Sequence, residues 1–190
     1  MHALLVHPEL PRTCWGFQYG LEAIGKHASL PPLGLITVAA LLPRAWEVRL
    51  CDLNVAPLRE DDLRWADAVL VGGMLVQEPS MHEVLVRSRA LGRRTIVGGP
   101  AASTSPGRFP DADVVFGGEA EGRDAELIAL VEGTTPAIVP LRKDLRPDVS
   151  SSPLPRFDLL ALGAYTTPPR STCSPRSSPT RRSPSRWSAS

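Results

Sequence analysis

The fold is decided by three short stretches, "DAVLVGG" at positions 67–73, "RTIVGG" at 94–99 and "DVVFGG" at 113–118. Each is a continuous apolar run that ends in a glycine pair. Runs of this length are typical of parallel strands that are covered on both faces. Between the first two, "SMHEVLVRSRALG" at 80–92 has apolar residues at helical spacing, Ser80 and Glu83 as a capping box, and Gly92 as a stop. This alternation of strand and helix predicts a parallel α/β sheet.

The flanking sequence extends the same pattern. A short apolar run in "HALLVHPE" (2–9) predicts a buried strand, and "PPLGLITVAALLP" (31–43) predicts a buried helix. Apolar and polar residues alternate in "WEVRLCDLN" (46–54), as in an edge strand, and "EGRDAELIALVEG" (121–133) is typical of an amphipathic helix. We therefore predict a flavodoxin-like, doubly wound, five-stranded parallel sheet of order 2-1-3-4-5, with strands at 3–6, 46–51, 67–71, 94–98 and 113–116.

Composition divides the chain into three parts. Residues 1–133 form the predicted α/β domain. Residues 134–165 are rich in proline and aperiodic, which predicts a linker with one short ordered piece, "RFDLLALGAY", at its end. Residues 166–190 are rich in Ser and Pro and carry five arginines and no acidic residue. A segment of this kind cannot bury enough apolar surface to fold, so we predict a disordered tail.

The overall composition bounds the class of protein. The chain has 190 residues, is 43% hydrophobic and carries a formal net charge of +1, which indicates one globular domain with an appendage. No stretch approaches the about 20 apolar residues of a membrane span, and the first residues lack a signal-peptide pattern, so we expect a cytoplasmic protein. A basic tail can bind nucleic acid or be phosphorylated. The rest of the chain has no basic or aromatic surface pattern, so no nucleic-acid partner is expected.

The cysteines do not form a recognisable motif. Cys14, Cys51 and Cys173 are scattered, odd in number and without C-x-x-C spacing. This pattern argues against a disulfide framework and against a self-contained metal site. We interpret Cys14 and Cys51 as ordinary reduced thiols.

The glycine pairs indicate where a ligand would bind. In open α/β sheets, ligands bind beyond the carboxyl ends of the strands, and all three pairs fall there. Glycine lets a ligand approach the backbone, so three neighbouring pairs indicate a broad surface for a large planar ligand. The alternative is that each pair merely turns the chain at the end of its strand. The first loop contains no G-x-G-x-x-G dinucleotide fingerprint, and the sequence has no P-loop.

An ordered set of segments carries a resemblance to a known family. The segments are "ASLPPLGLITVAALLPRAWEVRLCDLNVAPL" (28–58), "ADAVLVGGMLVQ" (66–77), "IVGGPAASTSP" (96–106), "VVFGGEAEG" (114–122) and "SSPLPRFDLLALGAY" (151–165). Together they resemble the amino-terminal part of cobalamin-binding radical S-adenosylmethionine proteins, in particular the subgroup that includes hopanoid methylases. The resemblance runs in the same order along the chain from about Leu4 to Tyr165.

The resemblance implies a cobalamin-binding domain whose corrin lies over the carboxyl ends of the strands. It also implies that the parent enzyme transfers a methyl group. The implied contacts are the three glycine loops, to which we add the acidic residue after the second strand. The candidate cofactor-binding residues are Asp52, Gly72, Gly73, Met74, Gly98, Gly99, Pro100, Gly117, Gly118 and Glu119.

Two motifs associated with such proteins do not occur in this sequence. The D-x-H-x-x-G motif, whose histidine ligates cobalt in many cobalamin domains, is absent, so we assign no axial ligand among His2, His7, His27 and His82. The C-x-x-x-C-x-x-C motif that holds a [4Fe–4S] cluster is also absent, and the tail offers only Cys173. We therefore expect a truncated or frameshifted enzyme that is inactive alone, with the cluster and S-adenosylmethionine belonging to the full-length parent.

A second function from another class stays open. A flavodoxin-like regulatory or nucleotide-binding module without cobalamin would have the same fold. A receiver domain would need paired acidic residues after the first strand, and only Asp52, after the second strand, is present.

Overall fold

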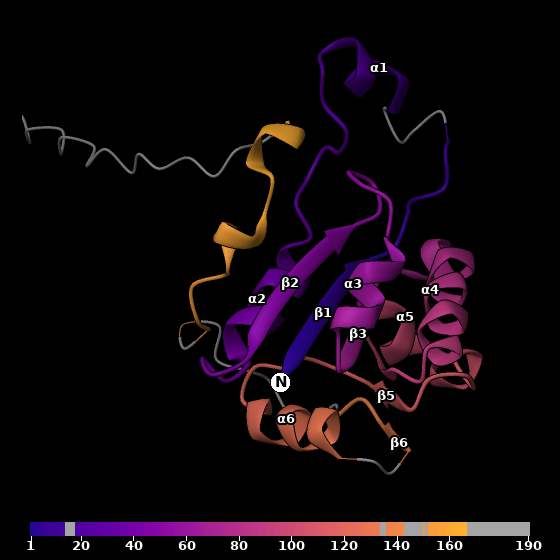
Figure 1. Cartoon of the computed structure of the whole chain (residues 1–190), viewed down its shortest axis with the longest axis vertical. Helices are drawn as coiled ribbons and strands as arrows, with labels where there is room; N and C mark the ends of the chain where they lie inside the picture. The colour runs from indigo at the N-terminus through magenta and orange to yellow at the C-terminus, as the bar shows by residue number, and fades with distance from the viewer. Residues whose placement is uncertain (14–17, 134–135, 143–149, 151, 167–190) are drawn as a thin grey trace, which may run out of the picture.

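The computed structural model describes residues 1–13, 18–133, 136–142, 150 and 152–166. Its centre is a six-stranded sheet of order β2-β1-β3-β4-β5-β6 (Figure 1), in which every neighbouring pair is parallel. The strands are β1 (His2–His7), β2 (Glu47–Asp52), β3 (Ala68–Gly72), β4 (Arg94–Gly98), β5 (Val114–Phe116) and β6 (Ala137–Val139). The flavodoxin-like order of the first five strands and the edge position of β2 are confirmed.

The sheet has one more strand than the five predicted. β6 pairs with β5, and Val114 stands opposite Ala137 in the register. It forms from a three-residue apolar run among prolines, in the segment interpreted as a linker. A run this short has no periodicity to detect, so the partner edge of β5, rather than local sequence, determines the strand.

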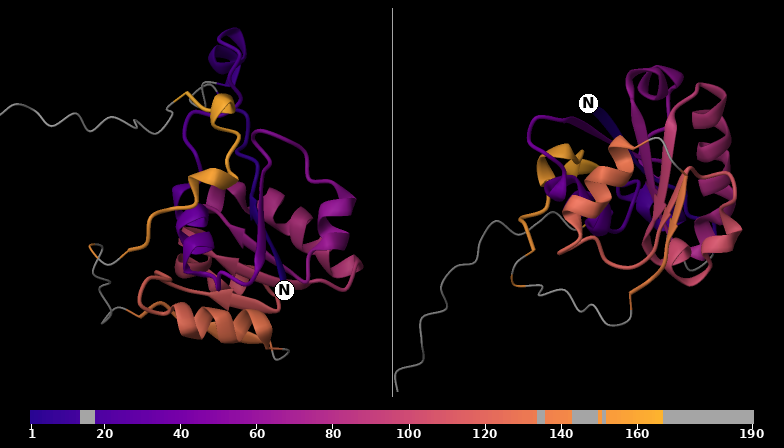
Figure 2. Two further views of the ribbon diagram at one scale, coloured as in Figure 1. Left: turned by 60° about the vertical axis from the view of Figure 1, so that its left-hand side comes forward. Right: turned by 90° about the horizontal axis from the view of Figure 1, so that it is seen from below.

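Helices cover both faces of the sheet. One face packs against α3 (Glu60–Trp65), α4 (Glu78–Ala90) and α5 (Gly99–Thr104), and the other packs against α2 (Leu33–Leu41) and α6 (Asp124–Glu132). Figure 2 shows α4 and α6 on opposite sides of the strands. Successive residues of β1 point to opposite faces, so that Leu4 and Leu5 enter different cores. The central strands β1, β3, β4 and β5 are therefore buried between two layers, as their continuous apolar runs predict.

The helix predicted at 80–92 differs at its start. α4 begins at Glu78 with Pro79 in its first turn, so Ser80 lies inside the helix and the predicted capping box is wrong. The Ser80 hydroxyl instead accepts a hydrogen bond from the Glu9 backbone N–H at 2.9 Å. The predicted stop of α6 at Gly133 is confirmed. The short helices α1 (Gln18–Ala23), α3 and α5 were not predicted.

The segment 152–166, which we call the strap, returns over the domain (Figures 1 and 2, orange). It contains two short 3₁₀ turns, η4 (Phe157–Leu159) and η5 (Leu162–Ala164). The Ala164 carbonyl accepts hydrogen bonds from the His27 and Ala28 N–H groups at 2.9 and 3.2 Å, and the Thr166 N–H donates to the Ala28 carbonyl at 3.2 Å. The strap therefore has defined backbone contacts with residues 27–28, which precede α2.

Several predictions fall outside the described residues. These are the disordered tail beyond Thr166, the thiols of Cys14 and Cys173, and most of the linker between 143 and 151. Within the described parts of the chain, no helix has both the length and the apolar character needed to cross a membrane.

Candidate functional site

A cavity of about 690 Å³ opens at the carboxyl ends of the central strands, on the face covered by α2 and α6. Its floor consists of strand side chains from one face of the sheet, Leu70, Ile96 and Phe116. Leu35 of α2 and Leu127 of α6 stand on either side. The cavity is therefore an apolar slot that lies where open α/β sheets bind ligands.

The structure brings eight of the ten predicted residues together around this cavity. They are Gly72, Gly73, Met74, Gly98, Gly99, Pro100, Gly118 and Glu119. The other two, Gly117 and Asp52, do not line it. Gly117 packs against the segment after β6, where an added Cβ would lie 2.8 Å from the Leu141 backbone nitrogen.

The glycines of the three pairs serve different purposes. Gly99 has a φ of +83°, and an added Cβ would lie 3.3 Å from the backbone nitrogen and oxygen of Gly73. The absence of a side chain at Gly99 therefore lets the loop after β4 approach the loop that contains Gly73. Gly98 has an extended backbone, with φ −136° and ψ −172°, and an added Cβ would meet only the Phe116 carbonyl oxygen, at 3.9 Å. Gly98 is thus the position of the three loops where a missing side chain leaves open space in the cavity wall.

Gln77 is a buried polar residue that the sequence analysis missed. Its side chain is 1% exposed and lies in η1 (Leu75–Gln77), directly after the glycine loop of β3. The Gln77 Oε1 atom accepts the Met74 N–H at 2.9 Å, and Nε2 donates to the Pro8 carbonyl at 2.5 Å. Gln77 therefore fixes the loops after β1 and β3 relative to each other. The only sequence signal for this role was a polar residue directly after the apolar run "MLV" at 74–76.

His7 is the histidine that lies at this site. All four histidines are in the described residues, and His7 alone lines the cavity, with Nδ1 at 3.5 Å from the Gly72 carbonyl oxygen. His2 stacks on Trp65, and His82 stacks on Phe109. Their ring contacts account for these two side chains without a ligand.

Arg123 and Ser103 support the rim near β5. The Arg123 guanidinium lies 4.3 Å from the centre of the Phe116 ring and donates to the Gly117 carbonyl at 2.8 Å. Its hydrogen bond to Glu126 lowers the pKa of that carboxyl. The Ser103 hydroxyl donates to the Gly99 carbonyl and accepts the Gly118 N–H, each at 2.9 Å. These contacts hold the second and third glycine loops together.

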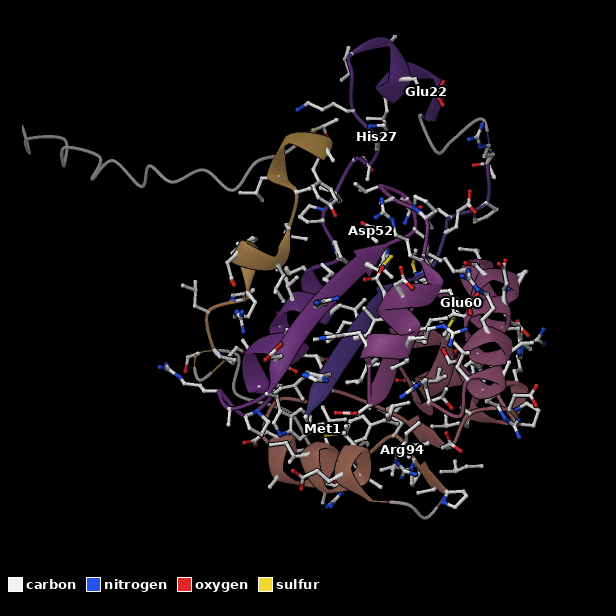
Figure 3. All side chains as sticks on the ribbon, in the orientation of Figure 1. Met1, Glu22, His27, Asp52, Glu60 and Arg94 are labelled. Carbon is white, nitrogen blue, oxygen red and sulfur yellow. The ribbon has the colours of Figure 1, made fainter. Side chains whose placement is uncertain are left out.

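Asp52 lies at the carboxyl end of β2 (Figure 3), beside a second cavity of about 540 Å³ between β2 and the strap. Asp52 is 6% exposed. One oxygen accepts the Tyr165 hydroxyl at 2.9 Å, and the other accepts the backbone and side-chain N–H groups of Asn54 at 2.9 and 2.8 Å. Burial, together with the charge of Asp52, raises the pKa of Tyr165, so its hydroxyl stays protonated and donates. Both oxygens of Asp52 thus have partners within the protein.

We expect Cys51, which lines the second cavity, to react slowly with alkylating reagents. Burial, with the nearby carboxylates of Asp62 and Asp52, raises the pKa of its thiol from 9.0 to about 11. Because the thiolate is the reactive form, alkylation at pH 8 should be about a hundredfold slower than in the unfolded chain. Mass spectrometry of the peptide that contains Cys51 after iodoacetamide treatment, with and without urea, measures the ratio. Equal rates in the two conditions would contradict the burial of this thiol.

The amino-acid sequence of this chain is similar to those of two known proteins. No protein-family model matches the chain. An uncharacterized methyltransferase of Synechocystis sp. is 41% identical over 168 residues, which cover 87% of this chain and 31% of the relative. The hopanoid C-2 methylase of Rhodopseudomonas palustris is 32% identical over 167 residues, which cover 85% of this chain and 32% of the relative.

These matches point to a methylase family. They support the similarity to hopanoid methylases that the sequence segments indicated. The chain spans about a third of the length of the curated relatives it matches.

Proposed function

We propose that this chain is the cobalamin-binding module of a methylase related to these two proteins, and that cobalamin binds at the 690 Å³ cavity. The observation that carries the proposal is the opening at Gly98, with the three glycine loops around it. A planar ring needs backbone without a projecting side chain, and Gly98 supplies it. When bound, cobalamin would supply the cobalt chemistry of methyl transfer.

The residues of the cavity suit a large, mainly apolar ligand with polar groups at its edge. Leu70, Ile96 and Phe116 offer an apolar floor that excludes water from one side of the ligand. Glu119 and Glu121 lie at the rim, where their carboxylates can accept hydrogen bonds from amide groups. His7 lines the same cavity, with Nδ1 beside the Gly72 carbonyl oxygen. In this proposal these residues bind and orient the cofactor.

The reaction itself is assigned to the longer enzyme. In this proposal the [4Fe–4S] cluster and S-adenosylmethionine implied by the family resemblance belong to regions of the relatives that this chain does not span. The module would hold cobalamin at the carboxyl edge of the sheet, where a neighbouring region can reach the exposed side of the ring. In this proposal the substrate is also bound by the longer enzyme rather than by this module alone.

Titration of the purified chain with hydroxocobalamin tests the proposal. We expect cobalamin to co-elute with the protein on gel filtration at a ratio near one, with a change in the visible spectrum of the bound cofactor. Flavin mononucleotide and ATP serve as comparison ligands, because a flavodoxin-like nucleotide module would retain one of them instead. A chain that retains a nucleotide and no cobalamin would overturn the proposal.

A further inference from the structure

A run of buried and partly buried hydrogen bonds begins at the strap. The Tyr165 hydroxyl donates to Oδ2 of Asp52 at 2.9 Å, although the two residues are 113 positions apart in sequence. Asn54 Nδ2 donates to Oδ1 of the same carboxylate at 2.8 Å. Tyr165 is 2% exposed and Asp52 is 6% exposed. The strap is therefore fixed to the end of β2 by groups that have little access to water.

The same run continues to the cavity. Asn54 Nδ2 also donates to the Pro8 carbonyl at 3.2 Å, and Gln77 Nε2 donates to that carbonyl at 2.5 Å. Gln77 Oε1 then accepts the Met74 N–H at 2.9 Å. Met74 lines the cavity, as does His7, the neighbour of Pro8. An unbroken series of contacts thus joins the strap to two loops of the candidate site.

The two buried contacts of the series, Tyr165 with Asp52 and Gln77 with Pro8, depend most strongly on their neighbours. A buried polar group that loses its partner bears the full cost of desolvation, so the arrangement in which all of them are paired is strongly favoured. Without the Tyr165 hydroxyl, Oδ2 of Asp52 has no other hydrogen-bond partner among the described residues. The carboxylate would then shift toward water and draw Asn54, and with it Pro8, out of position.

We propose that the strap and the cavity loops form one coupled unit, in which Tyr165 and Asp52 act as positioning residues for the loops that bear His7 and Met74. Docking of the strap sets these loops, and a ligand that orders the loops in turn tightens the strap. Such reciprocity is required of any two sites that share a coupling free energy. The first half of the proposal, that docking of the strap sets the loops, does not depend on any ligand. The second half, that a bound ligand tightens the strap, rests on the proposed binding of cobalamin.

Hydrogen exchange on the full chain without ligand tests the first half. Tyr165→Phe keeps the buried ring and removes only the hydroxyl. We expect faster exchange in the strap and also at the Met74 amide, whose N–H is held by Gln77. Thr37→Val is the matched control, because the Thr37 hydroxyl donates to the Leu33 carbonyl within α2 and belongs neither to the strap nor to the series. It should leave the Met74 amide at the wild-type rate.

Gln77→Met tests the coupling from the other end. It removes both side-chain hydrogen bonds of Gln77 while keeping its approximate length, and it should raise exchange in the strap at 156–166. If Tyr165→Phe loosens only the strap, or Gln77→Met loosens only the 73–77 loop, the coupling does not exist. Because the two variants act from opposite ends, failure of one to fold leaves the other to decide.

Titration with hydroxocobalamin tests the second half. We expect bound cobalamin to slow exchange in the strap of the wild type, and Tyr165→Phe to weaken binding on the order of fivefold. A chain that binds no cobalamin removes the proposed function, and the ligand-free exchange still decides the coupling. If cobalamin binds and changes neither strap exchange nor the affinity of Tyr165→Phe, the ligand-dependent half is overturned.

Discussion

Replacing Gly98 with Val is expected to abolish tight cobalamin binding while leaving the sheet intact. The backbone at Gly98 is extended, so a β-branched residue is sterically allowed there. An added Cβ has no neighbour closer than the Phe116 carbonyl oxygen at 3.9 Å, so the new side chain enters the cavity rather than the core. A ring that rests on the backbone would then be held away by several ångströms.

Visible titration measures the effect. We expect the Kd to rise by at least about tenfold, equivalent to about 1.4 kcal/mol. Gly107→Val is the matched control, because an added Cβ at this exposed glycine meets nothing within 4 Å and Gly107 does not line the cavity. Wild-type affinity in Gly98→Val, with an unchanged circular dichroism spectrum, would place the ligand elsewhere.

The other glycines of the loops give less specific tests. An added Cβ at Gly73 would lie 3.2 Å from Gln77 Oε1, Met81 Sδ and Pro8 Cγ, so a larger residue would disturb the protein first. At Gly99 both the positive φ and the contact with Gly73 oppose a side chain. Loss of binding in these variants would not separate a blocked ligand from a displaced loop.

The central sheet could be predicted because its sequence signals are local. The runs that become β3, β4 and β5 are apolar throughout, and strands buried on both faces require this. The alternation in β2 marks one half-exposed face at the edge of the sheet. Short elements were not predicted because they contain too few residues to show a helical or strand periodicity. α5 has six residues and begins with Gly-Pro, and contacts with β3, β4 and β5 hold it in place.

The candidate site was predictable only in part, for a similar reason. Three glycine loops converge because parallel strands end at the same edge, and this rule needs no knowledge of side chains. The partner of Asp52 could not be inferred, because Tyr165 lies 113 residues away in a segment without periodicity. Gln77 was missed because its role depends on the Pro8 carbonyl, which only the folded chain brings near. Hydrogen bonds between polar groups far apart in the sequence are thus the part of the site that the sequence did not predict.

Replacing Gly117 with Ala is expected to destabilise the domain by displacing β6. An added Cβ would lie 2.8 Å from the Leu141 nitrogen, 2.9 Å from the Val139 oxygen and 3.1 Å from the Pro140 carbonyl carbon. All three are backbone atoms, which cannot rotate away as a flexible side chain can. The methyl group would therefore move β6 off β5 and break the 2.8 Å hydrogen bond from the Gly117 N–H to the Val139 carbonyl.

Overpacking of this kind costs about 1–3 kcal/mol, so urea unfolding should show a lower midpoint for Gly117→Ala. Gly34→Ala is the control, because the same substitution should not lower the free energy of unfolding at this position. Gly34 lies in α2, an added Cβ there meets nothing within 4 Å, and alanine is the better helix former. It should leave the free energy of unfolding unchanged or raise it. If Gly117→Ala is as stable as the wild type, β6 does not pack against β5 as described, and the Leu141 side of the cavity is open.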